Sequence, residues 1–247
     1  MSGRLLACFL CVALAALGCA PWRQSRANVR TAGENGASAG PETAAERAKR
    51  ANVPEGAWIW IDVPQKALTL YRGAEQVKRY AIATGAWTTP TPIGTFRVTH
   101  RFSGDLGGFG TRFLGLNVPW GQFGIHGTNK PGSIGGNASH GCVRMLIADS
   151  EELYRQTPNG AKVVIQGGPY GPLGSQLRIL RAGDRNSHVV AVQRRLNALG
   201  YYGGGADGVF GQGTQAAVRK ARTALGLPAG DQVDPAFYGA IGLCLFE

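Results

Sequence analysis

The sequence predicts a mainly β domain, a sandwich or barrel with one helix, followed by a small bundle of three helices. Two patterns lead to this fold class. From Trp58 onward, short apolar runs recur at a spacing of roughly 8–12 residues with turn residues between them, which is typical of an all-β domain. Beyond the glycine- and proline-rich stretch 167–172, apolar residues recur instead at helical spacing. The 247 residues leave room for two domains, at roughly 100–200 residues per domain.

The first domain is expected to contain five well-marked strands and one helix. Residues 104–136 are rich in glycine and are expected to form loops around further short strands. The helix is expected over residues 148–156, with Asp149 near its start and Pro158 beyond its end. Alternating apolar residues between turns place the strands at 59–63, 67–71, 77–84, 94–100 and 161–165.

Three helices are expected in the second domain. The first follows the periodic apolar residues between 189 and 199 and ends at Gly200. The second is expected to use Thr214 as its N-cap, and the third to open at Asp234, which precedes a proline. Together these short helices predict a small bundle with its own core.

The N-terminus predicts export. Arg4 is followed by thirteen apolar residues, 5–17, which match the apolar region of a secretory signal and are too few to span a hydrocarbon layer of about 30 Å. Gly18-Cys19 resembles a bacterial lipobox, although Ala16 stands where leucine is usual, so we expect Cys19 to carry lipid and to anchor the protein to a membrane. An ordinary signal peptide is the alternative.

The charge balance favours an anionic partner. Lys and Arg number 26 against 15 Asp and Glu, giving a net charge of +11. Such a charge suits nucleic acid, anionic lipid or an anionic cell-wall polymer. Because the protein is expected to be exported, nucleic acid is not expected as a partner.

The strongest chemical signal is a histidine and a cysteine in two glycine-containing segments. His126 precedes Gly127, and residues 139–145 read Ser-His-Gly-Cys-Val-Arg-Met. A thiol becomes a strong nucleophile as its thiolate, and a neighbouring imidazole can accept the thiol proton. Glycine lets the backbone approach a bound carbonyl closely, and the N–H groups near Gly141 and Cys142 can bind an oxyanion. The pattern therefore indicates nucleophilic catalysis.

Two other interpretations of these residues stay open. Cys142 could pair with Cys244, since exported proteins usually pair their cysteines. His126, His140 and Cys142 could instead bind zinc, because a His-x-Cys strand places both side chains on one face. No fourth ligand or nearby carboxylate base is evident for such a zinc site.

Residues from about 58 to 166 resemble the catalytic domain of the L,D-transpeptidases. The signature of that family is a His, a spacer, then Ser/Thr-His-Gly-Cys followed by an apolar residue and Arg, and His126 with residues 139–144 supplies every part. The segment 91–96, Thr-Pro-Ile-Gly-Thr-Phe, also matches the family pattern. One position departs from it: Ile147 stands where the family usually has Asn.

The resemblance implies a role for each residue of the signature. Cys142 is the implied nucleophile, and His126 is the implied base, oriented by the backbone carbonyl of Gly127. The remaining signature residues are implied to shape the oxyanion hole or to support the site and the substrate carboxylates: Ser139, His140, Gly141 and Arg144. No metal or organic cofactor is implied.

Residues from about 177 to 243 resemble the small peptidoglycan-binding domain that is common in cell-wall enzymes. Leu199-Gly200-Tyr201 and the Asp207-Gly208 turn are among the matching residues. At 221–222 the chain has Ala-Arg where that family often has Phe-Gln, which predicts a thinner core. We expect Tyr201, Tyr202 and Asp207 to suit contact with a saccharide or a stem peptide.

The expected organisation is a signal peptide at 1–19, a linker at 20–56 with a short helix near 43–50, a catalytic domain at 57–168 and a peptidoglycan-binding domain at 177–244. The resemblances imply an exported enzyme of the cell envelope or periplasm. Its cysteine would form a thioester with a stem tetrapeptide and pass it to an amine, making a 3→3 cross-link or anchoring a protein. Water as acceptor would make it an L,D-carboxypeptidase, and a non-catalytic peptidoglycan-binding lipoprotein is a further alternative.

Overall fold

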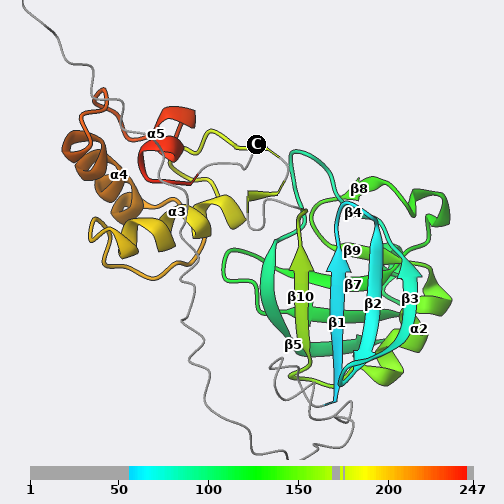
Figure 1. Cartoon of the computed structure of the whole chain (residues 1–247). Helices are drawn as coiled ribbons and strands as arrows, with labels where there is room; N and C mark the ends of the chain where they lie inside the picture. Colours follow the sequence, from blue (N-terminus) through cyan, green and yellow to red (C-terminus); the bar gives the residue numbers. More distant parts are fainter. Residues whose placement is uncertain (1–55, 169–172, 175, 244–247) are drawn as a thin grey trace, which may run out of the picture. The chain divides into compact units, whose positions relative to one another are not determined.

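The computed structural model describes residues 56–168, 173–174 and 176–243 (Figure 1). The expected signal segment with Cys19, the expected linker and its short helix up to residue 55, and Cys244 lie outside the described residues. In the described part of the chain, no helix has the length and apolar character needed to cross a membrane.

Residues 56–168 form the expected mainly β domain. An eight-stranded sheet has the strand order β3-β2-β1-β10-β5-β6-β7-β9, and a second, two-stranded sheet pairs β4 with β8. One α-helix, α2 (Ile147–Gln156), accompanies them. In chain order the strands are β1 (Ala57–Asp62), β2 (Ala67–Arg72), β3 (Glu75–Ala81), β4 (Thr84–Gly85), β5 (Gly94–Ser103), β6 (Arg112–Leu116), β7 (Phe123–Gly127), β8 (Asn137–Ser139), β9 (Val143–Met145) and β10 (Lys162–Gln166).

The large sheet curls until it is nearly closed. Residues 94–97 of β5 pair with β10 while the rest of β5 pairs with β6, with a bulge between Val98 and His100. Bulges bend a strand and increase its twist. At the other end, Ala83 and Arg144 exchange backbone hydrogen bonds of 2.8 and 2.9 Å. In Figure 1, β7 and β9 therefore lie behind β1 and β2.

The expected strand over 77–84 is divided into two. Its first part is β3, and its last residue begins β4, because Ala83 leaves the β2 partner to pair with Arg144. The glycine-rich stretch 104–136 contains β6 and β7 together with two 3₁₀ turns, η1 (Gly107–Phe109) and η2 (Pro131–Ser133).

Side chains that alternate between the two faces of each strand form the core of this domain. In β1, Ile59 and Ile61 are fully buried, while Trp58 on the opposite face stacks on Tyr71 with ring centroids 4.4 Å apart. The helix packs against β6 and β7 and buries Leu153. It begins at residue 147, one position before the expected start, with Asp149 in its first turn.

The described residues beyond 173 hold the three expected helices, α3 (Ser187–Ala198), α4 (Gln212–Ala224) and α5 (Pro235–Ala240). They enclose a separate apolar cluster that includes the fully buried Phe210, Phe237 and Tyr238. Asp234 caps α5 as expected, since its side chain accepts the Phe237 N–H.

Thr214, in contrast, is not an N-cap. Helix α4 begins at Gln212 with Gly211 in the cap position, and Thr214 lies inside the first turn. Its buried hydroxyl accepts a 3.0 Å hydrogen bond from the Gln193 side chain, so it holds α3 to α4 and is not used to close the helix end.

The core at 221–222 is filled in an unexpected way. Arg222 is 5% exposed, and its guanidinium lies 3.0 Å from the Asp234 carboxylate and 5.8 Å from the Phe237 ring centroid. It also donates to the carbonyls of Pro228 and Gln232 at 2.8 and 3.0 Å. The long stem of the arginine therefore occupies the space that the sequence predicted to be thin.

Candidate active site

Strands β7 and β9 bring His126 and the cysteine segment together. They run parallel, with His126 opposite Arg144 and Ile125 opposite Val143. Continuing this register by one residue places Cys142 beside Gly124, whose backbone hydrogen bond acts on the thiol. Side chains two residues apart in a strand point to the same face, so Cys142, Arg144 and His126 are directed to one face of the sheet.

His126 is held in one orientation and one tautomer. Its side chain is 2% exposed, and Nδ1 lies 2.5 Å from the carbonyl oxygen of Gly127. Because a carbonyl can only accept, we assign the ring proton to Nδ1, which leaves Nε2 as the basic nitrogen. Burial lowers the pKa of His126, and hydrogen bonds to the backbone of Gly127 and Phe109 offset part of that effect.

Burial also favours the neutral form of the Cys142 thiol. Burial raises its pKa above the ordinary value of a thiol, while the Gly124 backbone and the charge of Arg144 act in the opposite direction. A lowered imidazole pKa and a raised thiol pKa together favour the neutral pair over a thiolate–imidazolium pair. The geometry therefore suits an imidazole that takes the proton as the thiol attacks.

Ser139 organises the loop that carries the cysteine. Its hydroxyl donates to the carbonyl of Cys142 at 2.5 Å and accepts the N–H of Gly141 at 3.0 Å. Gly141 has φ of +116°, and a Cβ there would lie 2.5 Å from the Phe123 ring. Since the Gly141 N–H is engaged by Ser139, the N–H of Cys142 is the better candidate for an oxyanion donor.

The other two signature side chains have different surroundings. The side chain of His140 is exposed. Arg144 is half-buried, and its Nε has no hydrogen-bond partner within the described residues. Its positive charge lowers the pKa of both His126 and Cys142.

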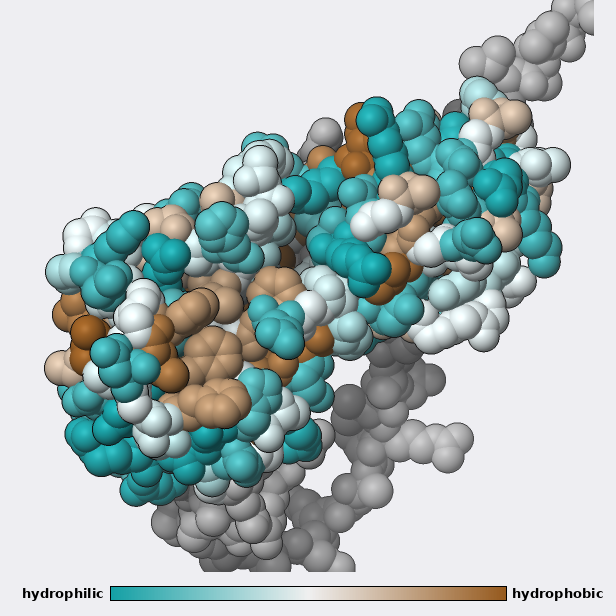
Figure 2. Space-filling view, turned by 180° about the vertical axis from the view of Figure 1, so that it is seen from behind, coloured by the Kyte–Doolittle hydropathy of each residue, from teal (hydrophilic) through white to brown (hydrophobic). Residues whose placement is uncertain are grey.

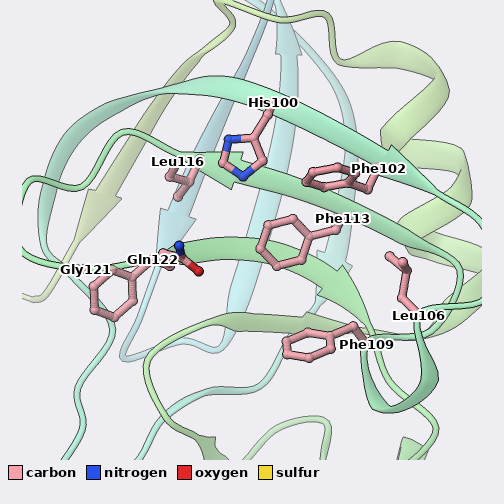
Figure 3. A pocket seen from close by; sticks show the side chains of 9 residues that line it. His100, Phe102, Leu106, Phe109, Phe113, Leu116, Gly121 and Gln122 are labelled. Carbon is pink, nitrogen blue, oxygen red and sulfur yellow. The ribbon is translucent and has the colours of Figure 1, made fainter.

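An aromatic pocket of about 360 Å³ adjoins His126. Phe109 meets the His126 ring edge-on at 4.6 Å, and Phe113 stacks on it at 5.9 Å between centroids. Figure 3 shows the rings of His100, Phe102 and Phe113 arranged along neighbouring strands. The pocket is lined by His100, Phe102, Leu106, Phe109, Phe113, Leu116, Gly121, Gln122 and Phe123.

Two glycines in the strands make room for this pocket. Pairing across the sheet puts His100 opposite Gly115, and Gly115 opposite Gly124. A Cβ on Gly115 would lie 2.0 Å from the His100 ring, and one on Gly124 would lie 2.4 Å from the Phe113 ring. In Figure 2, apolar side chains gather in a hollow on the β domain, with hydrophilic residues around it.

The sequence did not predict this pocket, because the short strands expected within residues 104–136 had no assigned position or register. A signal was present: aromatic residues at 100, 102 and 113 belong to two strands and become neighbours once β5 pairs with β6. Recognising the pocket requires the register of the β5–β6 pair, which could not be read from a glycine-rich sequence.

Ile147 departs from the family pattern without leaving a gap. Its side chain lies against the backbone of Gly110 and Gly127, since a Cβ on either glycine would be 3.2–3.3 Å from Ile147 Cγ1. The hairpin between β5 and β6 is tied to α2 by other groups, including a 2.6 Å hydrogen bond from Thr111 to Glu151.

Two alternatives for Cys142 were a zinc site and a disulfide, and only the zinc site can be examined within the described residues. No group of three His, Cys, Asp or Glu side chains within the described part of the chain is placed to hold a metal ion, so a zinc site finds no support there. A disulfide to Cys244 involves a residue outside the described ranges.

The peptidoglycan-binding candidates separate into two groups. Tyr201 and Tyr202 line a shallow hollow of about 460 Å³ together with Lys220. Asp207 instead serves the local turn, because its carboxylate accepts from the Gln193 side chain and the Val209 N–H, both at 2.9 Å.

A curved β sheet that directs a buried histidine and a glycine-flanked cysteine to one face defines a candidate acyl-transfer domain. The comparison with protein families agrees with this class. Residues 56–165 match the L,D-transpeptidase catalytic domain, and residues 185–241 match a "Putative peptidoglycan binding domain". By these matches the chain has an L,D-transpeptidase catalytic domain at residues 56–165, followed by a peptidoglycan-binding domain at residues 185–241.

Two curated relatives and two solved structures illustrate the similarity. "Putative L,D-transpeptidase YkuD" of Bacillus subtilis is 41% identical over 107 residues, which are 43% of this chain and 64% of the relative. YqjB of the same organism is 34% identical over 101 residues, 35% of this chain and 57% of the relative. The catalytic domain of the Enterococcus faecium L,D-transpeptidase is 23% identical with a TM-score of 0.40, covering 45% of this chain and 98% of that one. An L,D-transpeptidase from Mycobacterium smegmatis is 21% identical with a TM-score of 0.39, covering 45% of this chain and 58% of that one.

Proposed function

We propose that this protein is an exported, cysteine-dependent L,D-transpeptidase that acts on peptidoglycan stem peptides in the cell envelope. The observation that carries the proposal is the buried His126, oriented by the Gly127 carbonyl and directed to the same sheet face as Cys142. The family of residues 56–165 supports the reaction class.

The first half of the reaction forms a thioester. His126 Nε2 accepts the proton of the Cys142 thiol as sulfur attacks the carbonyl carbon of the third stem residue, a diamino acid. The oxyanion of the tetrahedral intermediate is met by the N–H of Cys142, a donor of a kind worth roughly 3–4 kcal/mol of barrier. The intermediate then collapses, and His126 returns the proton to the amine of the departing D-Ala.

The second half consumes the thioester. An acceptor amine attacks the thioester carbonyl, His126 takes a proton from that amine, and the new amide forms as the Cys142 sulfur leaves and is reprotonated. An amine on another stem would give a 3→3 cross-link, and an amine on a protein would anchor that protein. Water as acceptor would instead give a tripeptide and make the enzyme an L,D-carboxypeptidase.

The pocket and the helical domain have complementary parts in this proposal. The aromatic pocket adjoins His126 through Phe109 and Phe113, which supports it as the place where the donor stem lies against the sheet. The match of residues 185–241 supports attachment of the helical domain to peptidoglycan, with Tyr201 and Tyr202 as contact residues. Export and a lipid anchor on Cys19 complete the proposal.

The deciding experiment incubates the purified protein with disaccharide-tetrapeptide muropeptides and analyses the products by mass spectrometry. Cross-linked dimers support the transpeptidase, tripeptides alone support the carboxypeptidase, and unchanged substrate supports a non-catalytic binding protein. Cys142→Ala should abolish either product, whereas Cys244→Ala serves as the matched cysteine control. Turnover that survives in Cys142→Ala would exclude Cys142 as the nucleophile.

A further inference from the structure

Lys66, in the turn between β1 and β2, has an unusual backbone. Its φ of 51° is the only positive φ of a non-glycine residue within the described ranges. Side chains with a Cβ rarely adopt this left-handed conformation, and such residues persist where the surrounding structure holds them. Its backbone carbonyl also accepts the N–H of Ile82 at 2.9 Å, which fixes the chain just before β4.

The ammonium group of Lys66, a half-buried residue, is held by three acceptors. Nζ lies 2.6 Å from Asn137 Oδ1, 2.7 Å from Thr84 Oγ1 and 3.0 Å from the carbonyl oxygen of Val63. These three acceptors use all three donors of the group, and none of them is a carboxylate. Partial burial lowers the pKa of Lys66.

The contacts of Lys66 lead directly to the cysteine loop. Asn137 begins β8, and the Thr84 hydroxyl of β4 also donates to Asn137 Oδ1 at 3.1 Å. Two residues further on is Ser139, whose hydroxyl holds both the Gly141 N–H and the Cys142 carbonyl. The Ser139 carbonyl is itself held by the N–H of Ala86 at 2.8 Å.

The small sheet needs such an anchor. The strands β4 and β8 contain two and three residues, and a two-stranded pair of this length has little stability of its own. His126, in contrast, lies inside the eight-stranded sheet. Pairing of β9 with β7 holds the residues that follow Cys142. The residues that precede Cys142 depend on how firmly β8 is attached, and Lys66 adds to the backbone bonds of β8 from the β1–β2 turn.

We propose that Lys66 is a positioning residue for Cys142. Through Thr84 and Asn137 it steadies β8, and through Ser139 it steadies the residues before Cys142, so that the thiol keeps the position relative to His126 that the pairing of β7 with β9 provides. This inference rests on the proposed function for its assay with substrate, but the positioning itself can be measured on the thiol.

The test compares Lys66→Met, which keeps the aliphatic stem and removes the three donors, with Lys78→Met as the matched lysine control. Lys78 is on β3 and pairs with Glu152 at 2.6 Å, outside the cysteine loop. The readouts are the rate of Cys142 alkylation by iodoacetamide between about pH 6 and 10, and the acylation rate with a carbapenem. Misplacing a reacting group by about 1 Å costs on the order of 100-fold. We expect Lys66→Met to lose about 10- to 100-fold in maximal acylation rate, with little change in the half-saturating carbapenem concentration.

The pH profile separates positioning from stability. In Lys66→Met, alkylation at neutral pH should fall toward that of a thiol without a base and recover as pH rises, as expected for His126→Gln. Lys66→Arg, which keeps a charged donor, should recover part of the rate. The acylation rate of the double variant Lys66→Met/Asn137→Leu should fall no further than that of the more impaired single variant, because both changes break the same connection.

Several outcomes would overturn the inference. One is a Lys66→Met protein that melts at a lower temperature but keeps the alkylation profile and acylation rate of Lys78→Met. If Lys66→Met does not fold, Thr84→Val removes one acceptor and must produce the same direction of change in the alkylation profile. If muropeptides give no product while the Lys66 variants still alter alkylation, the proposed function fails and the positioning role stands.

Discussion

Replacing His126 by glutamine tests the proton transfer on which the proposed chemistry depends. Gln keeps a polar side chain of similar reach but cannot accept a proton from the thiol. Burial lowers the pKa of His126 and raises that of Cys142, and both shifts favour a pair of neutral imidazole and neutral thiol. The attack therefore needs a base at the moment of reaction, and the variant has only solvent hydroxide.

The size of the loss follows from the ionisation of the thiol. An ordinary thiol with pKa about 8.5 is roughly 3% ionised at pH 7, and burial makes the thiolate of Cys142 rarer still. A positioned general base contributes about 10²–10⁴-fold, equivalent to about 2.7–5.4 kcal/mol of barrier. We expect His126→Gln to lose at least about 100-fold in acylation rate at pH 7, and the loss to shrink about tenfold for each pH unit toward the thiol pKa.

The assay follows the mass shift of the protein during reaction with a carbapenem from about pH 5 to 10, with thermal unfolding as a check on folding. In the wild type the base must be neutral, so the rate falls as pH drops through the His126 pKa. Because burial places that pKa below its usual value of about 6.5, the wild-type rate should be level from about pH 6.5 upward.

Two results would refute this reasoning. A folded His126→Gln protein with the wild-type rate at pH 7 would show that His126 is not the base. A wild-type rate that begins to fall well above pH 7 would mean that the imidazole pKa is raised, which contradicts its buried, neutral state.

Three further changes test other parts of the structure. Gly141→Ala should abolish acylation and lower the thermal midpoint, because it places a Cβ 2.5 Å from the Phe123 ring at φ +116°; a variant with normal acylation would contradict the described loop. Arg222→Ala should destabilise the helical domain by about 2–4 kcal/mol in calorimetry, since it leaves the Asp234 carboxylate without its buried partner, while an unchanged transition would show that the pair contributes nothing. Cells fed a clickable fatty acid should label the wild type and not Cys19→Ser, and equal labelling of both would exclude Cys19 as the lipid site.

Several features could be predicted because they are encoded locally. The helix at 148–156 and the capping of α5 by Asp234 depend on neighbours in sequence, and the structure confirms both. The order His126, Ser139 and Cys142 could also be recognised in the sequence, since the chemistry requires those residue types. The assignment of Thr214 as an N-cap was wrong because a tertiary hydrogen bond from Gln193 competed with the local preference.

The glycines show where local reasoning stops. Their number between 104 and 136 suggested loops around short strands, without saying which glycines the strands contain. Gly115 and Gly124 lie in β6 and β7 and leave space beneath the rings of His100 and Phe113. A glycine in a turn and a glycine beneath a pocket look alike in sequence, because the difference lies in what faces the missing side chain.

The sequence by itself therefore determined the four α-helices of the described residues, most of the longer strands, the division into a β region and a helical region, and the candidate nucleophile and base, because these depend on residue type and short-range periodicity. The tertiary structure alone decided the aromatic pocket, the burial of Arg222 and the attachment of the cysteine loop to Lys66. Each of these joins residues far apart in the chain, as Lys66 and Asn137 are, and such contacts exist only once the sheet has its register.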